Sequence, residues 1–307
     1  MATMMLRLLA LSSCAAALVA PPTKRHTTRL QATVAEATGG ANAKLVDDLA
    51  ARTKDARQQA DDLIPCGDDA DLKTWLARFI KDGDVDAAEA KVRESIDWRT
   101  GEGRKICEAA RDAVNEAMSE GAWTNRPVQE KAPHGSKINA FFEGGRVMNL
   151  RNKAGDGLIY AIRAGDIDDK ALMSAVTVDE LADFFLYAKA INERACSAIS
   201  KKTGTLATVT TVNDLAGVDL LGDASFRNAL SAASKRGDAF FPGLSGPTVL
   251  LNLPRLLGAL VKLFTPLFPE SVRAKLRFER FPLGDAGALS TESGRANLSD
   301  YIADLLG

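Results

Sequence analysis

The stretch that decides the fold is TLATVTTVNDLAG, residues 205–217. A run of β-branched residues from Thr208 to Val212 predicts a strand, because such side chains favour the pleated conformation. The strand is expected to end at Asn213-Asp214, and Gly217 marks the turn that follows. A second short apolar run, TVLL at 248–251, predicts another strand.

The second strand leads through Asn252 into the segment PRLLGALVKLF, residues 254–264, called here the gate segment. If it forms a helix that begins at Pro254, then Arg255, Gly258 and Lys262 lie along one narrow stripe of that helix. Large apolar side chains occupy the rest of its circumference. These apolar residues are Leu256, Leu257, Leu260, Val261, Leu263 and Phe264. Exposing all six to water would cost on the order of 10 kcal/mol. The segment is too short and too charged to span a bilayer, so we expect it to cover an apolar surface; a buried core helix is the simpler alternative.

Five features in a fixed order now point to a family. They are Asp214 with Gly217, Asn252 with Pro254, the gate segment, Pro266-Leu267-Phe268, and Lys275-Leu276. In this order and spacing they resemble the lipid-binding core of the CRAL-TRIO family, which includes phosphatidylinositol transfer proteins and tocopherol and retinaldehyde carriers. The resemblance implies an α/β fold for residues 158–290: a mixed β-sheet forms the floor of a lipid pocket, with flanking helices and a hydrophobic gate helix.

Residues 41–120 show successive helical patterns, with a break at Gly83. The first is expected to end at Pro65. The run Leu-Ala-Arg-Phe-Ile at 76–80 and the pair Trp98-Arg99 resemble the small helical module that precedes CRAL-TRIO domains. This part of the chain is therefore predicted to be an all-helical N-terminal module.

The remaining boundaries follow from composition and capping. Residues 121–157 are rich in Gly, Asn, Pro and Lys and are expected to be an irregular linker. Leu158 to Ile162 predicts a strand, and Thr177 with Glu180 predicts a capping box that begins a long helix. Residues 291–307 are expected to be a C-terminal tail with one amphipathic segment at 298–306.

Composition favours a globular chain that does not bind nucleic acid. Of its 307 residues 46% are hydrophobic, which is ample for a core. The 39 basic residues include four in the acid-free first 35 positions, so the rest carries 35 basic against 40 acidic side chains. A net charge of about −5 on that part argues against nucleic acid as a partner.

The N-terminus predicts a targeting leader. An apolar run from Leu6 to Leu18 behind Arg7 is typical of a signal peptide at 1–17, with small residues before the cut. Residues 18–38 have the composition of a transit peptide, with no acid before Glu36. A signal peptide followed by a transit peptide resembles the bipartite leaders of complex plastids, so a plastid (chloroplast) location is expected; the alternative is a secreted or endomembrane lumen protein.

No catalytic or cofactor motif is recognisable. After the leader only His134 remains, and the chain has no GxGxxG, P-loop, HExxH or EF-hand pattern. The three cysteines beyond the leader are widely spaced without a CxxC pair, which indicates neither a zinc site nor a disulfide framework. We therefore expect a protein that is not an enzyme and needs no cofactor.

The resemblance also implies residues for the headgroup. Lys275 stands where phosphatidylinositol-binding members contact the inositol phosphate, and Thr211 matches a hydroxyl used for phosphatidylcholine. Two positions depart from the family: Gly243 replaces a Glu, and Val209 replaces a Ser, so strict inositol or choline selectivity is not expected. Val209 is placed with the gate segment in the pocket, and Arg273 and Arg277 join Lys275 as headgroup candidates.

Six basic residues lie between positions 255 and 280, against Glu270 and Glu279. They are Arg255, Lys262, Arg273, Lys275, Arg277 and Arg280. This excess suits a phosphate headgroup or transient docking on an anionic membrane, although a solvated basic surface is the alternative. The expected function is binding and transfer of a phospholipid such as phosphatidic acid or a phosphoinositide. A carrier of a small isoprenoid and an interaction module without ligand are the alternatives.

Overall fold

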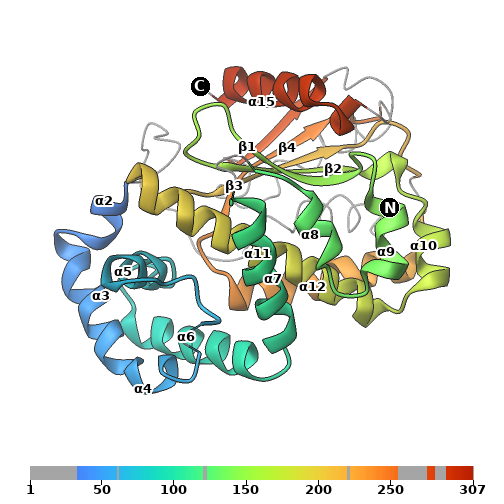
Figure 1. Ribbon diagram of the computed structural model, residues 1–307. Helices are drawn as coiled ribbons and strands as arrows, with labels where there is room; N and C mark the ends of the chain where they lie inside the picture. The colour runs from blue at the N-terminus through green and yellow to red at the C-terminus, as the bar shows by residue number, and fades with distance from the viewer. Residues whose placement is uncertain are drawn as a thin grey trace.

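A computed structural model of the chain describes residues 33–60, 62–119, 123–219, 222–254, 275–280 and 288–306. Within them a five-stranded sheet carries helices on both faces, and an all-helical N-terminal part packs beside it (Figure 1). This confirms the predicted fold class, a mixed α/β sheet with flanking helices that follows a helical N-terminal part. The gate segment beyond Pro254 lies outside the described residues.

The elements follow one another in a simple order. The N-terminal helices are α2 (Val34–Thr38), α3 (Ala41–Arg52), α4 (Lys54–Arg57), α5 (Asp69–Ala77), α6 (Val85–Thr100) and α7 (Arg104–Ala117). Next come α8 (Arg126–Glu130), α9 (Gly135–Phe142), β1 (Val147–Arg151), β2 (Leu158–Arg163), η1 (Ala164–Asp166), α10 (Asp169–Ala175) and α11 (Val178–Thr203). The remainder are β3 (Val209–Asp214), α12 (Ala224–Phe240), β4 (Ser245–Leu251), β5 (Leu276–Glu279), η3 (Ala288–Ser290) and α15 (Glu292–Leu306).

The strands lie in sequence order, β1-β2-β3-β4-β5. β1 is antiparallel to β2, and the other neighbours are parallel. In this register Tyr160 lies beside Thr211, and Thr211 lies beside Thr248. The pairing of β3 with β4 shifts between Val209 and Thr211, where β4 contains Pro247. A proline has no N–H to give the ladder, so an irregularity is expected there.

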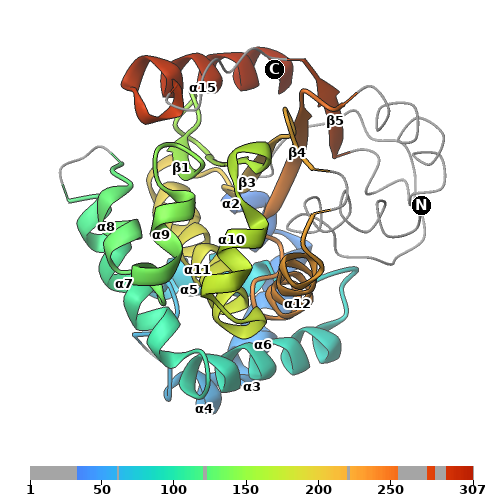
Figure 2. The same cartoon turned by 90° about the vertical axis from the view of Figure 1, so that its right-hand side faces the viewer.

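The alternation of the strands divides the core into two layers. Side chains such as Ile159, Val212 and Val249 point to the face covered by α15, while Leu158, Val209 and Leu250 point to the face covered by α11. Figure 2 shows α15 on one side of the sheet, and α11 with its neighbour α12 on the other. The site described below lies in the α11 layer.

The long helix α11 begins and ends as its sequence predicts. The Thr177 hydroxyl accepts a hydrogen bond from the Glu180 N–H at 3.2 Å, and the Glu180 carboxylate accepts one from the Thr177 N–H at 2.9 Å. At the other end Gly204 takes the left-handed conformation, with φ +70°. Such a cap favours glycine because it has no Cβ to clash. α11 therefore runs 26 residues across the sheet.

The fold reaches further toward the N-terminus than the predicted leader boundary at residue 38 allows. Thr33 forms a β-bridge with Thr205, and the Val34 N–H donates to the Gly204 carbonyl at 2.8 Å. A capping box between Thr33 and Glu36 begins α2. Residues 33–38 thus pack against the end of α11. The lack of acidic residues before Glu36 suggested a leader that extends to residue 38, whereas these long-range contacts make residues 33–38 part of the fold.

The segment 121–157 is not the irregular linker that its Gly, Asn and Pro content suggested. It contains α8, α9 and β1, and β1 pairs along its whole length with β2. Consequently the α/β part begins before residue 158. The first predicted helix is also divided, because α3 ends at Arg52 and α4 begins at Lys54. The Thr53 hydroxyl between them donates to the Leu49 carbonyl at 2.8 Å, a local bond that competes with the regular helix.

Two helices, α12 and α15, are more extensive than the sequence predicts. α12 occupies the polar segment between the two central strands, and the Asp223 side chain caps it by accepting from the Ser225 and Phe226 N–H groups. α15 is not a tail: Leu298 and Ile302 are buried against the sheet. Both helices have only a weak apolar periodicity in their own sequence. Their positions are determined by the part of the fold against which each one packs.

Candidate functional site

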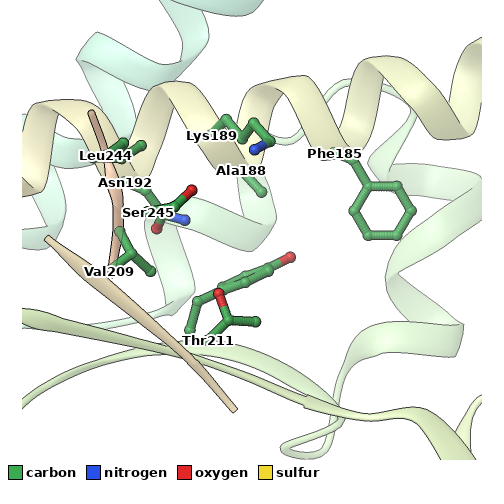
Figure 3. Close-up of a pocket in the computed structure, with 9 residues that line it drawn as sticks. Phe185, Ala188, Lys189, Asn192, Val209, Thr211, Leu244 and Ser245 are labelled. Atoms are coloured by element: carbon green, nitrogen blue, oxygen red, sulfur yellow. The ribbon is translucent and has the colours of Figure 1, made fainter. Parts of the chain in front are cut away.

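The site is a small cavity where α11 crosses the sheet. Its described walls are formed by Tyr160, Phe185, Ala188, Lys189, Asn192, Val209, Thr211, Leu244 and Ser245. Figure 3 shows Thr211 and Val209 of β3 on one side of the cavity, with Lys189 and Asn192 of α11 on the other. The space open to a water-sized group is about 20 Å³, which is enough for one water molecule. These walls alone therefore enclose no room for a lipid chain.

Thr211 and Val209 are brought together by the pleat of β3. They are two residues apart on one strand, so both side chains point to the face covered by α11. Both are buried, at 4% and 5% exposure. The sequence assigned Thr211 to the headgroup and Val209 to the pocket wall, and the structure places both on this one cavity.

Lys275 lies close to the same place. Its ammonium group donates a hydrogen bond to the Ser245 carbonyl at 3.1 Å, and Ser245 belongs to the cavity wall. Desolvation, and then the nearby charge of Lys81, lowers the pKa of Lys275. The Lys275 side chain is nonetheless exposed, so an anion beside it would have to compete with water.

Arg277 is not brought to the cavity. It pairs with Val249 in the parallel ladder between β4 and β5, and Val249 points to the α15 face of the sheet. Its guanidinium donates to the Leu276 carbonyl at 2.9 Å. The predicted role of Arg277 in the same headgroup site as Thr211 is therefore wrong, because neighbouring residues of a strand point to opposite faces. Arg273 and the six apolar residues of the gate segment lie outside the described residues.

The backbone conformation and the close surroundings of Gly243 explain why a glutamate does not occupy this position. It adopts φ +66°, and an added Cβ would lie 3.0 Å from both the Cβ and the carbonyl oxygen of Arg78. The buried Arg78 side chain donates to the Gly243 carbonyl at 2.9 Å and to the Ala207 carbonyl at 2.8 Å. The position thus serves a close contact between the helical part and the loop before β4, which only glycine fits without strain.

Two of the features that suggested the family meet at the carboxyl edge of the sheet. The Asn252 amide donates to the Asp214 carboxylate at 2.9 Å, and the Ala216 N–H donates to the same oxygen at 3.1 Å. Asn252 itself has φ +54°, a conformation that asparagine tolerates better than most residues. This contact fixes the chain at Asn252, two residues before the gate segment begins.

The helical N-terminal part is joined to α11 by a buried ion pair. Arg99 lies 2.9 Å from Glu193, and the Trp75 indole N–H donates to the same carboxylate at 2.9 Å. The Arg99 guanidinium also lies over the Phe241 ring, 4.8 Å from its centre. Trp98 stacks on Phe240 with the ring centres 4.5 Å apart. The Trp98-Arg99 pair therefore joins the helical part to the last residue of α12 and to the residue that follows it.

Lys189, Asn192, Tyr160 and Ser245 line the cavity, although no motif in the sequence singles them out. A signal was present, because Lys189 and Asn192 are polar residues three apart within the apolar pattern of α11. Only the position of the helix over β2 and β3 shows that they enclose a space.

The three cysteines beyond residue 32 are free thiols. Desolvation raises the pKa of Cys66 and of Cys196 to about 12, so both stay protonated at neutral pH. Within the described part of the chain, no group of three or more His, Cys, Asp or Glu side chains could hold a metal ion. No described helix is long and apolar enough to cross a membrane.

Comparison with known proteins finds similarity at the level of solved structures. No family model matches the chain, and no curated protein matches it. A crystal structure of Sfh5 is similar over 77% of this chain and 79% of its own, with 12% sequence identity and a TM-score of 0.47.

Proposed function

We propose that this chain binds a lipid in an apolar pocket whose floor is the α11 face of the sheet, and transfers or presents it without chemical change. The observation that supports this most is the bond between Asp214 and Asn252. It holds the chain at the sheet edge two residues before the gate segment, and the six large apolar side chains of that segment need an apolar partner.

A lipid monomer in water exposes its chains at a cost of about 0.8 kcal/mol per methylene. A carrier must therefore offer apolar cover and a lid that opens at a membrane. The gate segment has the composition for both tasks, and its Arg255 and Lys262 would stay at the interface. The ligand that we favour is a phospholipid with an anionic phosphate, such as phosphatidic acid or a phosphoinositide.

Lipid transfer between vesicles tests the proposal. The full chain is mixed with donor vesicles that contain a fluorescent phosphatidic acid and with unlabelled acceptors, and transfer is followed by dequenching. The wild-type chain should transfer the probe. The double variant Leu257→Asp/Val261→Asp should not, because two carboxylates cannot enter acyl chains or a bilayer. Lys91→Asp, which adds an acid on an exposed position of α6, is the matched control and should transfer normally. Absence of transfer by the wild-type chain would overturn the proposal.

An isoprenoid is the second candidate ligand, supported by the apolar Val209 and the absent acid at Gly243. Native mass spectrometry of the purified chain separates the two, because a tocopherol and a phospholipid differ in mass. A chain that carries neither, and transfers neither, would be an interaction module.

We further propose that the leader directs the protein to a plastid. A reporter fused behind residues 1–32 should reach the plastid, and a reporter behind residues 1–17 should be secreted. Retention of both reporters in the cytosol would contradict this location.

A further inference from the structure

The helix α15 carries an acceptor motif for an N-linked sugar. Residues 297–299 are Asn-Leu-Ser, which matches the Asn-x-Ser/Thr triplet whose middle residue is not proline. None of the other asparagines in the sequence is followed by Ser or Thr two residues later. A motif of three residues is common by chance, so its place in the fold decides whether the chain can carry a sugar there.

Asn297 lies on the face of α15 that points away from the sheet. It is exposed, as are Asp300 and Asp304, which follow it at the helical spacings of three and seven residues. Leu298 and Ile302, by contrast, are 0% and 2% exposed and pack on the sheet. A sugar on Asn297 would therefore extend into solvent without displacing a core side chain.

Such a sugar would also leave the proposed lipid pocket free. α15 covers one face of the sheet and α11 covers the other (Figure 2). The floor of the proposed pocket is the α11 face. A bulky, solubilising group on the outer side of α15 is therefore compatible with lipid binding.

The folded helix cannot present the whole triplet at once. Residues two apart on an α-helix lie about 200° apart around its axis, so Asn297 and Ser299 point to different sides. Ser299 is 8% exposed, and its hydroxyl donates to the Arg151 carbonyl of β1 at 3.3 Å. An enzyme that needs both the amide and the hydroxyl can reach them together only before α15 packs on the sheet.

We propose that Asn297 receives an N-linked oligosaccharide as the chain enters the endomembrane lumen, before α15 folds. The inference rests on the proposed leader, whose first part is a signal peptide. In the transfer, the side-chain nitrogen of Asn297 bonds to the anomeric carbon of an oligosaccharide that is carried on a lipid diphosphate. The bond between that carbon and the diphosphate oxygen breaks, and one amide proton is released with the lipid diphosphate.

Translation of the full chain in the presence of endoplasmic-reticulum microsomes tests the assignment. The wild type should give a second, slower band that peptide N-glycosidase removes. That enzyme converts the modified asparagine into aspartate, so mass spectrometry locates the site. Asn297→Gln and Ser299→Ala should give no slower band. Ser299→Thr alters the same residue as Ser299→Ala but keeps the motif, and should still be modified.

Lys44→Thr is the control for entry into the lumen, because it makes the exposed Asn42 a second acceptor. In this variant, modification at Asn42 without modification at Asn297 would overturn the role of Asn297 while the leader stands. Modification at neither residue would overturn the proposed leader, and the inference with it. A slower band that persists in Ser299→Ala would also contradict the assignment.

The order of events has its own test. The folded wild-type chain, made without a transferase, is mixed with detergent-solubilised microsomes that supply the enzyme and the donor. It should stay unmodified, because its triplet is divided between two sides of α15. Ile302→Asp disrupts the packing of α15 but lies outside the triplet, and should be modified at Asn297. Equal modification of the two chains would contradict a transfer that precedes folding.

Discussion

The guanidinium of Arg99 and the carboxylate of Glu193 form an ion pair in the interior, with side chains only 1% and 3% exposed. The pair joins α6 of the helical N-terminal part to α11 on the sheet, and Arg99 also donates to the Leu63 and Phe240 carbonyls. One side chain thus links three segments that lie far apart in the sequence. The helical part and the α/β part are therefore expected to unfold together.

Arg99→Met should destabilise the protein strongly. It leaves the Glu193 carboxylate buried without its cation, which costs roughly 3 to 5 kcal/mol. Urea unfolding followed by circular dichroism measures the change. Arg126→Met breaks a pair with Glu130 whose side chains are 84% and 51% exposed, and should cost under about 1 kcal/mol. Similar losses in the two variants would contradict the structural role of the buried pair.

Gly243→Ala should cost more than Gly144→Ala. Both glycines have a positive φ, +66° and +69°, so both substitutions carry the same backbone strain of about 1 kcal/mol. Only at Gly243 does the new Cβ also press on Arg78, while at Gly144 nothing lies within 4 Å. The difference in the free energy of unfolding isolates the contact. Gly243→Glu should lower the free energy of unfolding at least as much as Gly243→Ala does. It should not create selectivity for inositol lipids, although the relatives that bind them have a Glu at this position.

Asp238→Asn should stabilise the protein above pH 6 and make little difference near pH 4. Desolvation, partly offset by Lys189, raises the pKa of Asp238 from 3.8 to about 6. Between these values the folded protein holds a proton that the unfolded chain releases, so the stability of the wild type falls as pH rises. At pH 7.5 the gain should be roughly 1 to 2 kcal/mol, since the side chain is partly exposed.

Thermal unfolding from pH 4 to pH 8 measures this effect. Asp304→Asn replaces an exposed carboxylate of α15 and serves as the control. A constant difference between the wild type and Asp238→Asn over the whole range would contradict the assignment.

Leu298→Ala should show that α15 belongs to the core. Leu298 is fully buried against the second face of the sheet, together with Leu289 and Ile302. Truncating such a side chain leaves a cavity and costs roughly 2 to 5 kcal/mol. The exposed Asp304→Ala on the same helix should cost under about 0.5 kcal/mol. A Leu298→Ala variant as stable as this control would mean that α15 does not pack as described.

The sequence by itself determined the elements whose signals are local. β-Branched runs produced β3 and the end of β4, because pleat preference acts residue by residue. The Thr177 and Glu180 side chains set the start of α11, because a capping box needs contacts only three residues apart. The α/β class followed from the family resemblance, and the strand that the local signals predicted carries both Thr211 and Val209.

Tertiary structure alone decided the rest, because the relevant partners are far apart in the chain. β1 lacked a clear signal and is a strand because β2 offers it an edge. Arg277 belonged to the headgroup set by sequence order, whereas the sheet register points it to the other face. Lys189 lines the cavity only because α11 crosses β2 and β3, and Gly237 of α12 leaves room for its stem. Periodicity records which face of an element is apolar; it does not record which element meets that face.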